Sequence, residues 1–280
     1  SVAIVWLRWK KISFTRPYIH LIVALGIIFM TNSFIPQLKR PLTQRMPYSI
    51  YYNFKLYFEI RDVAADHRET FTSESVAISD SLVVVFVIGE SLRNDHLQIN
   101  GYERETTPYL MEEDNLVSLT DIYGAECFTH TSVPQIMTRA DSANPQRAYD
   151  EQSFVTIFKD AGFRTTWIAN QESVATYAYF MNECDTLIYV NGDKSVYTFD
   201  KWLDEDILPH LENELKDDNP TQLHILHSIG SHWWYNSHYT DEFERYTPVI
   251  KSRVVSSNTQ EEMINSYDNT ILYTDFFIKE

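Results

Sequence analysis

The chain has 280 residues, 44% of them hydrophobic, and its 23 Lys and Arg against 39 Asp and Glu give a formal net charge of −16 at pH 7. This much apolar sequence can fill the core of one large domain or two smaller ones. The acidic balance excludes a typical nucleic-acid-binding protein, because phosphate backbones reward clustered positive charge. The sequence begins with Ser instead of Met, which suggests a piece of a longer protein.

The first part of the chain differs in charge from everything that follows. Residues 1–45 hold seven basic residues and no acid, which leaves 16 Lys and Arg against 39 Asp and Glu in the remainder. Residues 17–35 contain no charged side chain and are about as long as a bilayer core requires. Basic residues precede this stretch, as in cytoplasmic loops. We therefore predict the end of a membrane domain over 1–35, with a transmembrane helix at about 17–35; a buried core helix or an uncleaved signal sequence are the alternatives.

Residues 36–80 read as a linker at the membrane surface. Prolines stand at positions 36, 41 and 47, and residues 48–58 are rich in Tyr and Phe. Aromatic side chains gather at membrane–water interfaces, and their helical spacing predicts an amphipathic helix. Periodicity alone equally allows a helix that packs on the domain that follows.

An apolar strand marks the start of that domain. Residues 82–88 are all apolar, five of the seven are β-branched, and Gly89 and Glu90 come next. Such a run predicts a strand buried on both faces of a parallel sheet. Ligands of open α/β sheets bind beyond the carboxyl ends of the strands. Glu90 is therefore a candidate functional carboxylate, although it could also be a surface residue that caps the next helix.

Strand-like and helix-like segments alternate over the rest of the chain. We expect further strands at 116–121, 163–169, 186–190 and 223–229, and helices at 153–161, 201–215 and 261–277. The helix at 201–215 contains Pro209, which predicts a kink there. The alternation predicts an α/β domain with a mostly parallel sheet over residues 81–280.

Two polar segments are further candidates for a site. Ser132 is expected to cap a helix whose first turn contains Pro134. The N-terminus of a helix can hold a phosphoryl group, and ordinary capping is the alternative. His232 follows Gly230 and Ser231 at the end of an apolar strand, where a histidine is either functional or structural.

Together these segments resemble the phosphoethanolamine transferases of Gram-negative envelopes, which are membrane-anchored members of the alkaline phosphatase and sulfatase superfamily. The matching positions are 87–91, 93, 95–96, 100–102, 104, 106–108, 129, 132–134, 230–232, 243, 247–248, 267–269 and 271–275. The resemblance covers about residues 82–280. It implies an alkaline phosphatase-like α/β/α sandwich.

The resemblance also implies roles for four residues. Glu90 would be a zinc ligand, and Thr129 would touch the zinc and act as the nucleophile. His232 would hold the phosphoethanolamine or a second metal, and Asn100 would also bind the substrate. Zinc lowers the pKa of a bound hydroxyl, which lets a threonine attack phosphorus near neutral pH.

The implied reaction moves phosphoethanolamine from phosphatidylethanolamine to an envelope glycolipid, either lipid A or a core sugar, through a phospho-threonine intermediate. Such an enzyme is anchored in the bacterial inner membrane with its catalytic domain in the periplasm. A phosphoglycerol transferase or another hydrolase of the superfamily is the first alternative. A non-catalytic membrane-anchored remnant is the second.

The sequence departs from the family pattern at its metal ligands. The remaining ligands are expected in an Asp-His-Gly-Glu motif and a later His, and neither precedes Glu280. Because zinc usually takes four ligands, the chain alone is expected to bind zinc weakly and to be inactive. Cys127 and Cys184 are its only cysteines, and we expect both to be unpaired thiols.

Overall fold

The computed structural model describes residues 68–70, 74–171, 175–191, 194 and 201–280, with a few helical positions before residue 60. The chain divides into two compact units, Ser1–Asp62 and Val63–Glu280. Most of the predicted span at 17–35 and of the linker helix at 48–58 lies outside the described residues. Among the residues that are described, no helix is long and apolar enough to cross a membrane. The boundaries at 35 and 80 stay predictions.

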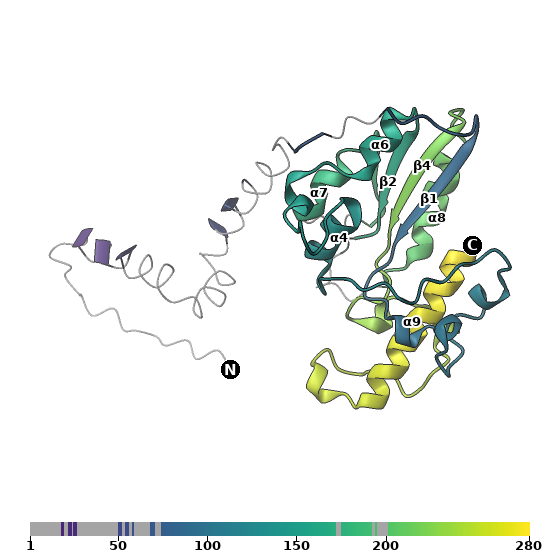
Figure 1. Ribbon diagram of the computed structural model, residues 1–280. Helices are drawn as coiled ribbons and strands as arrows, with labels where there is room; N and C mark the ends of the chain where they lie inside the picture. Colours follow the sequence, from purple (N-terminus) through teal and green to yellow (C-terminus); the bar gives the residue numbers. More distant parts are fainter. Residues whose placement is uncertain are drawn as a thin grey trace. The chain divides into compact units, whose positions relative to one another are not determined.

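A four-stranded parallel sheet forms the centre of the second unit (Figure 1). Its strands are β1 (Leu82–Ile88), β2 (Arg164–Ala169), β3 (Thr186–Tyr189) and β4 (Thr221–His227). The spatial order is β1-β4-β2-β3, and each neighbouring pair is parallel. The predicted α/β class with a parallel sheet is therefore confirmed.

Helices cover both faces of the sheet. They are α4 (Thr129–Met137), α5 (Arg147–Asp150), α6 (Phe154–Asp160), α7 (Ala175–Met181), α8 (Leu208–Glu214) and α9 (Gln260–Lys279). Short 3-10 helices lie at Asn94–His96, Gln98–Asn100, Leu110–Glu112, Asp204–Ile207, Tyr235–Ser237, Asp241–Phe243 and Val255–Ser257.

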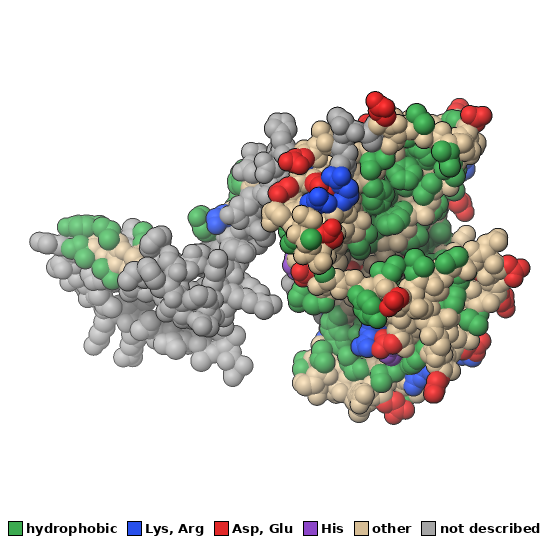
Figure 2. All heavy atoms as spheres, viewed as in Figure 1, with side chains coloured by type: hydrophobic (Ala, Val, Ile, Leu, Met, Phe, Trp, Pro, Cys, Tyr) green, Lys and Arg blue, Asp and Glu red, His purple; other side chains and the backbone are tan. Residues whose placement is uncertain are grey.

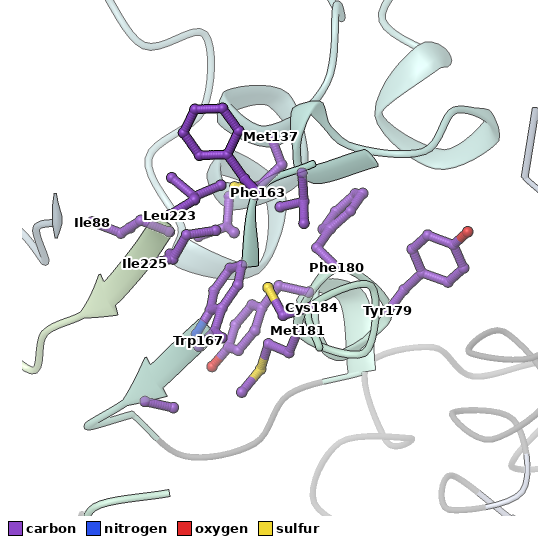
Figure 3. Close-up of a cluster of buried hydrophobic side chains, with 14 residues drawn as sticks. Ile88, Met137, Phe163, Trp167, Tyr179, Phe180, Met181, Cys184, Leu223 and Ile225 are labelled. Atoms are coloured by element: carbon purple, nitrogen blue, oxygen red, sulfur yellow. The ribbon is translucent and has the colours of Figure 1, made fainter. Parts of the chain in front are cut away.

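Side chains of the strands alternate between two cores, as the pleat requires. Trp167 and Ile225 point to one face and pack with residues of α4, α6 and α7, such as Phe180 (Figure 3). Their neighbours Ile168 and Leu226 point to the other face and pack with α8 and the end of α9. This alternation produces three layers, with the strand ends left free for a site.

The burial of β1 differs from its prediction. β1 is an edge strand among the described residues, since β4 is its one neighbour. Phe86 packs on Phe154 of α6 with ring centroids 5.1 Å apart. The opposite side chains, Val83, Val85 and Val87, are 38–47% exposed. Hydrophobic side chains gather in Figure 2 where Figure 1 places β1. The prediction of burial on both faces is therefore wrong: an apolar run does not reveal which faces are covered.

Two other predicted elements are also corrected. Residues 116–121 form no strand, and Val117 and Leu119 are 77% and 67% exposed. The predicted helix at 201–215 is a 3-10 turn, Asp204–Ile207, followed by α8. Pro209 stands in the first turn of α8, where its missing N–H leaves no helical hydrogen bond unmade. The proline therefore begins a helix instead of kinking one.

Helix α9 anchors the segment that follows β1. The buried Asp268 carboxylate accepts hydrogen bonds from His96 Nδ1 at 2.7 Å, from the Tyr102 hydroxyl at 2.9 Å and from Arg104 at 2.8 Å. Three donors from one loop thus converge on one carboxylate. The loop after β1 is fixed by this cluster and not by regular secondary structure.

Replacing Asp268 by Ala is expected to lower the free energy of unfolding by about 1–3 kcal/mol, because the donors of His96, Tyr102 and Arg104 would lose their common buried acceptor. Urea denaturation measures this. Asp95→Ala is the matched control: Asp95 pairs with Arg93 on the surface, with side chains 61% and 65% exposed. A surface pair of this kind contributes about 0–1 kcal/mol. Equal losses in the two variants would contradict the role given to Asp268.

Candidate active site

The pairing of β1 with β4 places the candidate residues at one edge of the sheet. The last residue of β1, Ile88, pairs with His227, the last residue of β4. The pairing continues past both strands, because Ser228 N–H donates to Ile88 O at 3.1 Å and Ser231 N–H donates to Glu90 O at 3.0 Å. The two segments that carry Glu90 and the turn to His232 are thereby hydrogen-bonded to each other.

A close backbone approach makes this pairing possible. Gly230 has a φ of +44°, and a Cβ atom there would lie 2.9 Å from the carbonyl oxygen of Glu90. Any other residue would bring its Cβ atom against the Glu90 backbone and would also have to adopt a left-handed φ. Ser91, on the facing segment, also has a left-handed φ of 52°. Backbone held in this region is typical of functional sites.

Glu90 and Thr129 form the centre of the site. Thr129 Oγ1 donates to Glu90 Oε2 at 2.6 Å, and Ser91 Oγ donates to Glu90 Oε1 at 2.6 Å. Glu90 is 7% exposed. Gln171 Nε2 lies 3.4 Å from the same Oε2 and donates to Ser228 O at 2.7 Å. The carboxylate predicted from the strand-end rule is thus held on both of its oxygens.

Thr129 stands at the start of α4. The predicted cap at Ser132 is wrong, because the N-cap is Phe128, four residues earlier, and the helix begins at Thr129. Ser132 Oγ donates instead to Glu126 O at 3.2 Å. Pro134 lies inside the helix. The earlier start places the Thr129 hydroxyl at the end of the helix whose unpaired N–H groups and dipole attract anions.

His232 lies beside this centre. It lines a cavity of about 410 Å³ together with Glu90, Thr129 and Gln171. Its Nδ1 is 2.6 Å from Trp233 O. A carbonyl oxygen can only accept, so Nδ1 carries the proton and Nε2 is the free nitrogen of the neutral ring.

Asn100 is not brought to this cavity. Its side chain binds Asn94 Oδ1 at 2.5 Å and accepts from Ser118 Oγ at 2.6 Å. The residues that line the cavities around Thr129 do not include it. Its role in substrate binding stays a prediction.

Sequence reasoning missed two contributors to the site. Gln171 follows the end of β2 and reaches Glu90, so the strand-end rule applied to every strand would have found it. Tyr267 of α9 donates its hydroxyl proton to Ser91 O at 2.7 Å and accepts from Arg93 N–H at 2.8 Å. No local pattern predicts this second contact, because it joins positions far apart in the chain.

The described residues fit half of a zinc site. The oxygens of Glu90 and Thr129 are close enough to share one ion, but zinc usually takes four ligands. No group of three or more His, Cys, Asp or Glu that could hold a metal occurs within the described part of the chain. Cys127 and Cys184 are both free thiols, as predicted. Burial raises the pKa of the Cys184 thiol to about 12, which disfavours the thiolate that a metal needs.

Two buried histidines beneath the site are neutral. His227 packs its ring against Tyr177 and Trp167, with centroids 5.0 and 5.8 Å away. Burial lowers the pKa of His227 to about 3. It also lowers the pKa of His238, whose Nδ1 donates to Trp202 O, to about 4. These rings serve the fold as uncharged groups.

A parallel sheet covered by helices, with a carboxylate and a hydroxyl at its strand ends, defines an α/β enzyme fold. A family model described as Sulfatase matches residues 83–280. The chain therefore belongs to the sulfatase family. The chain has the α/β alkaline phosphatase-like fold with a parallel sheet.

Relatives with this domain are named phosphoethanolamine transferases. The Kdo(2)-lipid A phosphoethanolamine 7''-transferase of Escherichia coli K12 is 35% identical over 213 residues, which are 74% of this chain and 37% of that protein. The chain thus spans little more than a third of the length of this relative.

Solved structures match the same region. The soluble domain of lipooligosaccharide phosphoethanolamine transferase A from Neisseria meningitidis has a TM-score of 0.68 and 26% identity, over 76% of this chain and 66% of that one. The periplasmic domain of Escherichia coli EptC in complex with Zn has a TM-score of 0.63 and 27% identity, over 72% of this chain and 58% of that one.

Gly230→Ala is expected to destabilise the protein by about 1–3 kcal/mol more than Gly162→Ala. Both glycines have positive φ, +44° and +87°, but a Cβ at Gly162 would meet nothing within 4 Å. The difference therefore isolates the contact with Glu90 from the cost of the backbone conformation. Thermal unfolding of the two variants measures it, and equal shifts in Tm would show that the contact is not tight.

The free energy of unfolding is expected to decrease as the pH is lowered below about 6.5, because histidines in the unfolded chain bind protons there. Folded His227 stays neutral down to about pH 3, so the unfolded state binds more protons between these values. His227→Phe removes one such group and should lower the slope of unfolding free energy against pH by up to about 1.4 kcal/mol per pH unit. Denaturant titrations between pH 7 and 4 test this, with the exposed His210→Phe as control. An unchanged slope in His227→Phe would contradict the burial of a neutral ring.

Proposed function

We propose that this chain carries the nucleophile and part of the metal site of a phosphoethanolamine transferase. The observation that carries the proposal is the 2.6 Å hydrogen bond from Thr129 Oγ1 to Glu90 Oε2 at the N-terminus of α4. A hydroxyl nucleophile needs a group that orients it and a positive field that receives the phosphoryl anion. The names of the matched relatives support phosphoethanolamine as the transferred group.

In the first step the Thr129 oxygen attacks phosphorus in the donor lipid. The bond between phosphorus and the oxygen of diacylglycerol breaks, and the proton of the Thr129 hydroxyl ends on that leaving oxygen. Glu90 orients the hydroxyl throughout, and the N–H groups at the start of α4 attract the phosphoryl oxygens. The product on the protein is a phosphoethanolamine ester of Thr129.

In the second step an oxygen of the acceptor attacks the same phosphorus. The bond to Thr129 breaks, and its oxygen regains a proton from the attacking hydroxyl. A zinc ion held by Glu90 and Thr129 would lower the pKa of the threonine hydroxyl and neutralise charge on the phosphoryl group. We propose that the remaining ligands of that ion come from the Asp-His-Gly-Glu motif and the later His that the family resemblance implies.

His232 and the cavity beside it are proposed to hold the phosphoethanolamine group. The free Nε2 of His232 can bind a phosphoryl oxygen once it is protonated. Asn100 is proposed as a more distant substrate contact. The 3-10 turns at 94–100, which carry Asn100, follow in the chain directly after the segment that carries Glu90.

The donor and acceptor are proposed from chemistry and from the relatives. Phosphatidylethanolamine is the phospholipid that carries this headgroup, and a lipid donor suits a domain preceded by the predicted span at 17–35. The relative that acts on Kdo(2)-lipid A supports an envelope glycolipid as acceptor. The match to a periplasmic domain of EptC supports a periplasmic site. Anchoring in the inner membrane is proposed from the predicted span at 17–35.

The test uses the full-length product of the gene in membranes, with phosphatidylethanolamine labelled in its ethanolamine. We expect a covalently labelled protein whose label maps to the peptide with Thr129. Thr129→Ala should abolish the label, whereas Thr131→Ala, on the same helix, should retain it, because Thr131 Oγ1 donates to the carbonyl oxygen of Phe128 at 3.0 Å and not to Glu90.

Label that persists in Thr129→Ala would contradict the proposed nucleophile. Label that comes from the glycerol headgroup of phosphatidylglycerol instead would replace this reaction by phosphoglycerol transfer.

A further inference from the structure

The turn that carries His232 rests on a buried carboxylate. Asp204 is 1% exposed and lies under the turn. Its Oδ1 accepts from Ile229 N–H at 2.8 Å, and its Oδ2 accepts from Gly230 N–H at 2.8 Å. Both oxygens of one carboxylate therefore bind successive backbone amides of the turn between β4 and His232.

The carboxylate is itself fixed from below. Asn170 Nδ2 donates to Asp204 Oδ1 at 2.8 Å, and Trp202 Nε1 donates to Asn170 Oδ1 at 2.7 Å. The indole can only donate, so it sets which end of the Asn170 amide faces Asp204. Asn170 N–H also binds His227 O at 2.8 Å. Hydrogen bonds through Asn170 thus join the segment at 202–204 to the end of β2 and the end of β4.

The segment at 202–204 holds the far end of the same loop. Trp202 N–H donates to Ser237 O at 2.8 Å, and His238 Nδ1 donates to Trp202 O at 2.9 Å. The stretch from 228 to 238 is therefore tied at both ends to residues 202–204. His232 lies between these two ties.

Three N–H donors surround the buried carboxyl group of Asp204. Burial raises the pKa of the Asp204 carboxyl, and the N–H groups of Asn170, Ile229 and Gly230 oppose that shift. The three donors point at the two oxygens of the carboxyl group, two at Oδ1 and one at Oδ2. An asparagine at this position would keep one acceptor oxygen and put an NH₂ group in place of the other, which cannot accept from a backbone N–H. Both oxygens of Asp204 are therefore needed to hold the turn.

We propose that Asp204 is a positioning residue for the site: it holds the turn so that Gly230 stays against Glu90 and His232 faces the cavity beside Thr129. That this positioning serves catalysis rests on the proposed function. The geometry stands by itself, because Gly230 binds Asp204 through its N–H and approaches Glu90 with its α-carbon. A shift of the turn would move His232 and the Glu90 backbone together.

Nuclear magnetic resonance of Asp204→Asn in the whole chain tests this proposal. We expect the exchange protection of the Ile229 and Gly230 amides to fall at least about tenfold, because an amide nitrogen would replace one of the two acceptor oxygens. The ring resonances of His232 should shift as well, while amides in the middle of α9 keep their protection. Asp206→Asn is the matched control, since its side chain is 42% exposed and pairs with Lys194.

Unchanged His232 resonances in a folded Asp204→Asn variant would overturn the proposal. If this variant does not fold, the wild-type chain decides: fast exchange of the Ile229 and Gly230 amides there would also overturn it, and strong protection of both would support it. These readouts need no transfer activity. A wild-type protein that transfers nothing would overturn the proposed function and leave this result intact.

Discussion

The parallel pairing of β1 with β4 is the contact on which the site is built. It puts Ile88 beside His227 and then continues through Ser231 N–H to the carbonyl of Glu90. Backbone hydrogen bonds, and not the functional side chains, therefore set the distance between the Glu90 carboxylate and the turn that leads to His232. The chemistry depends on a register, and a register of seven paired residues is costly to shift.

Elements from elsewhere in the chain then fix what the pairing leaves free. Helix α4 brings the Thr129 hydroxyl to Glu90 and adds the positive end of its dipole. Helix α9 holds the loop after β1 through Tyr267 and Asp268. Asp204 holds the turn after β4. Each contact joins distant parts of the sequence, so the site forms only when the whole unit has folded.

The features that the sequence predicts are those that depend on a local pattern of residues. The four strands were expected from apolar runs and lie within two residues of their predicted bounds, and Glu90 followed from the strand-end rule. Whether a face of a strand is buried depends on elements that are distant in the sequence. The exposure of Val85 on β1 was therefore not predicted. The same reason hides Asp204, whose partners Ile229 and Gly230 lie 25 and 26 positions away. Thr129 was recognised by family resemblance, since a threonine at the first position of a helix has no signal of its own.

The central claim is that Glu90 and Thr129 bind one metal ion at the joined ends of β1 and β4. Zinc anomalous diffraction from crystals of the full-length protein, grown with the metal, addresses it. One anomalous peak is expected at about 2.0–2.2 Å from a carboxylate oxygen of Glu90, with the Thr129 hydroxyl as a further ligand. Zinc bound elsewhere, with Thr129 still hydrogen-bonded to a metal-free Glu90, would contradict the claim.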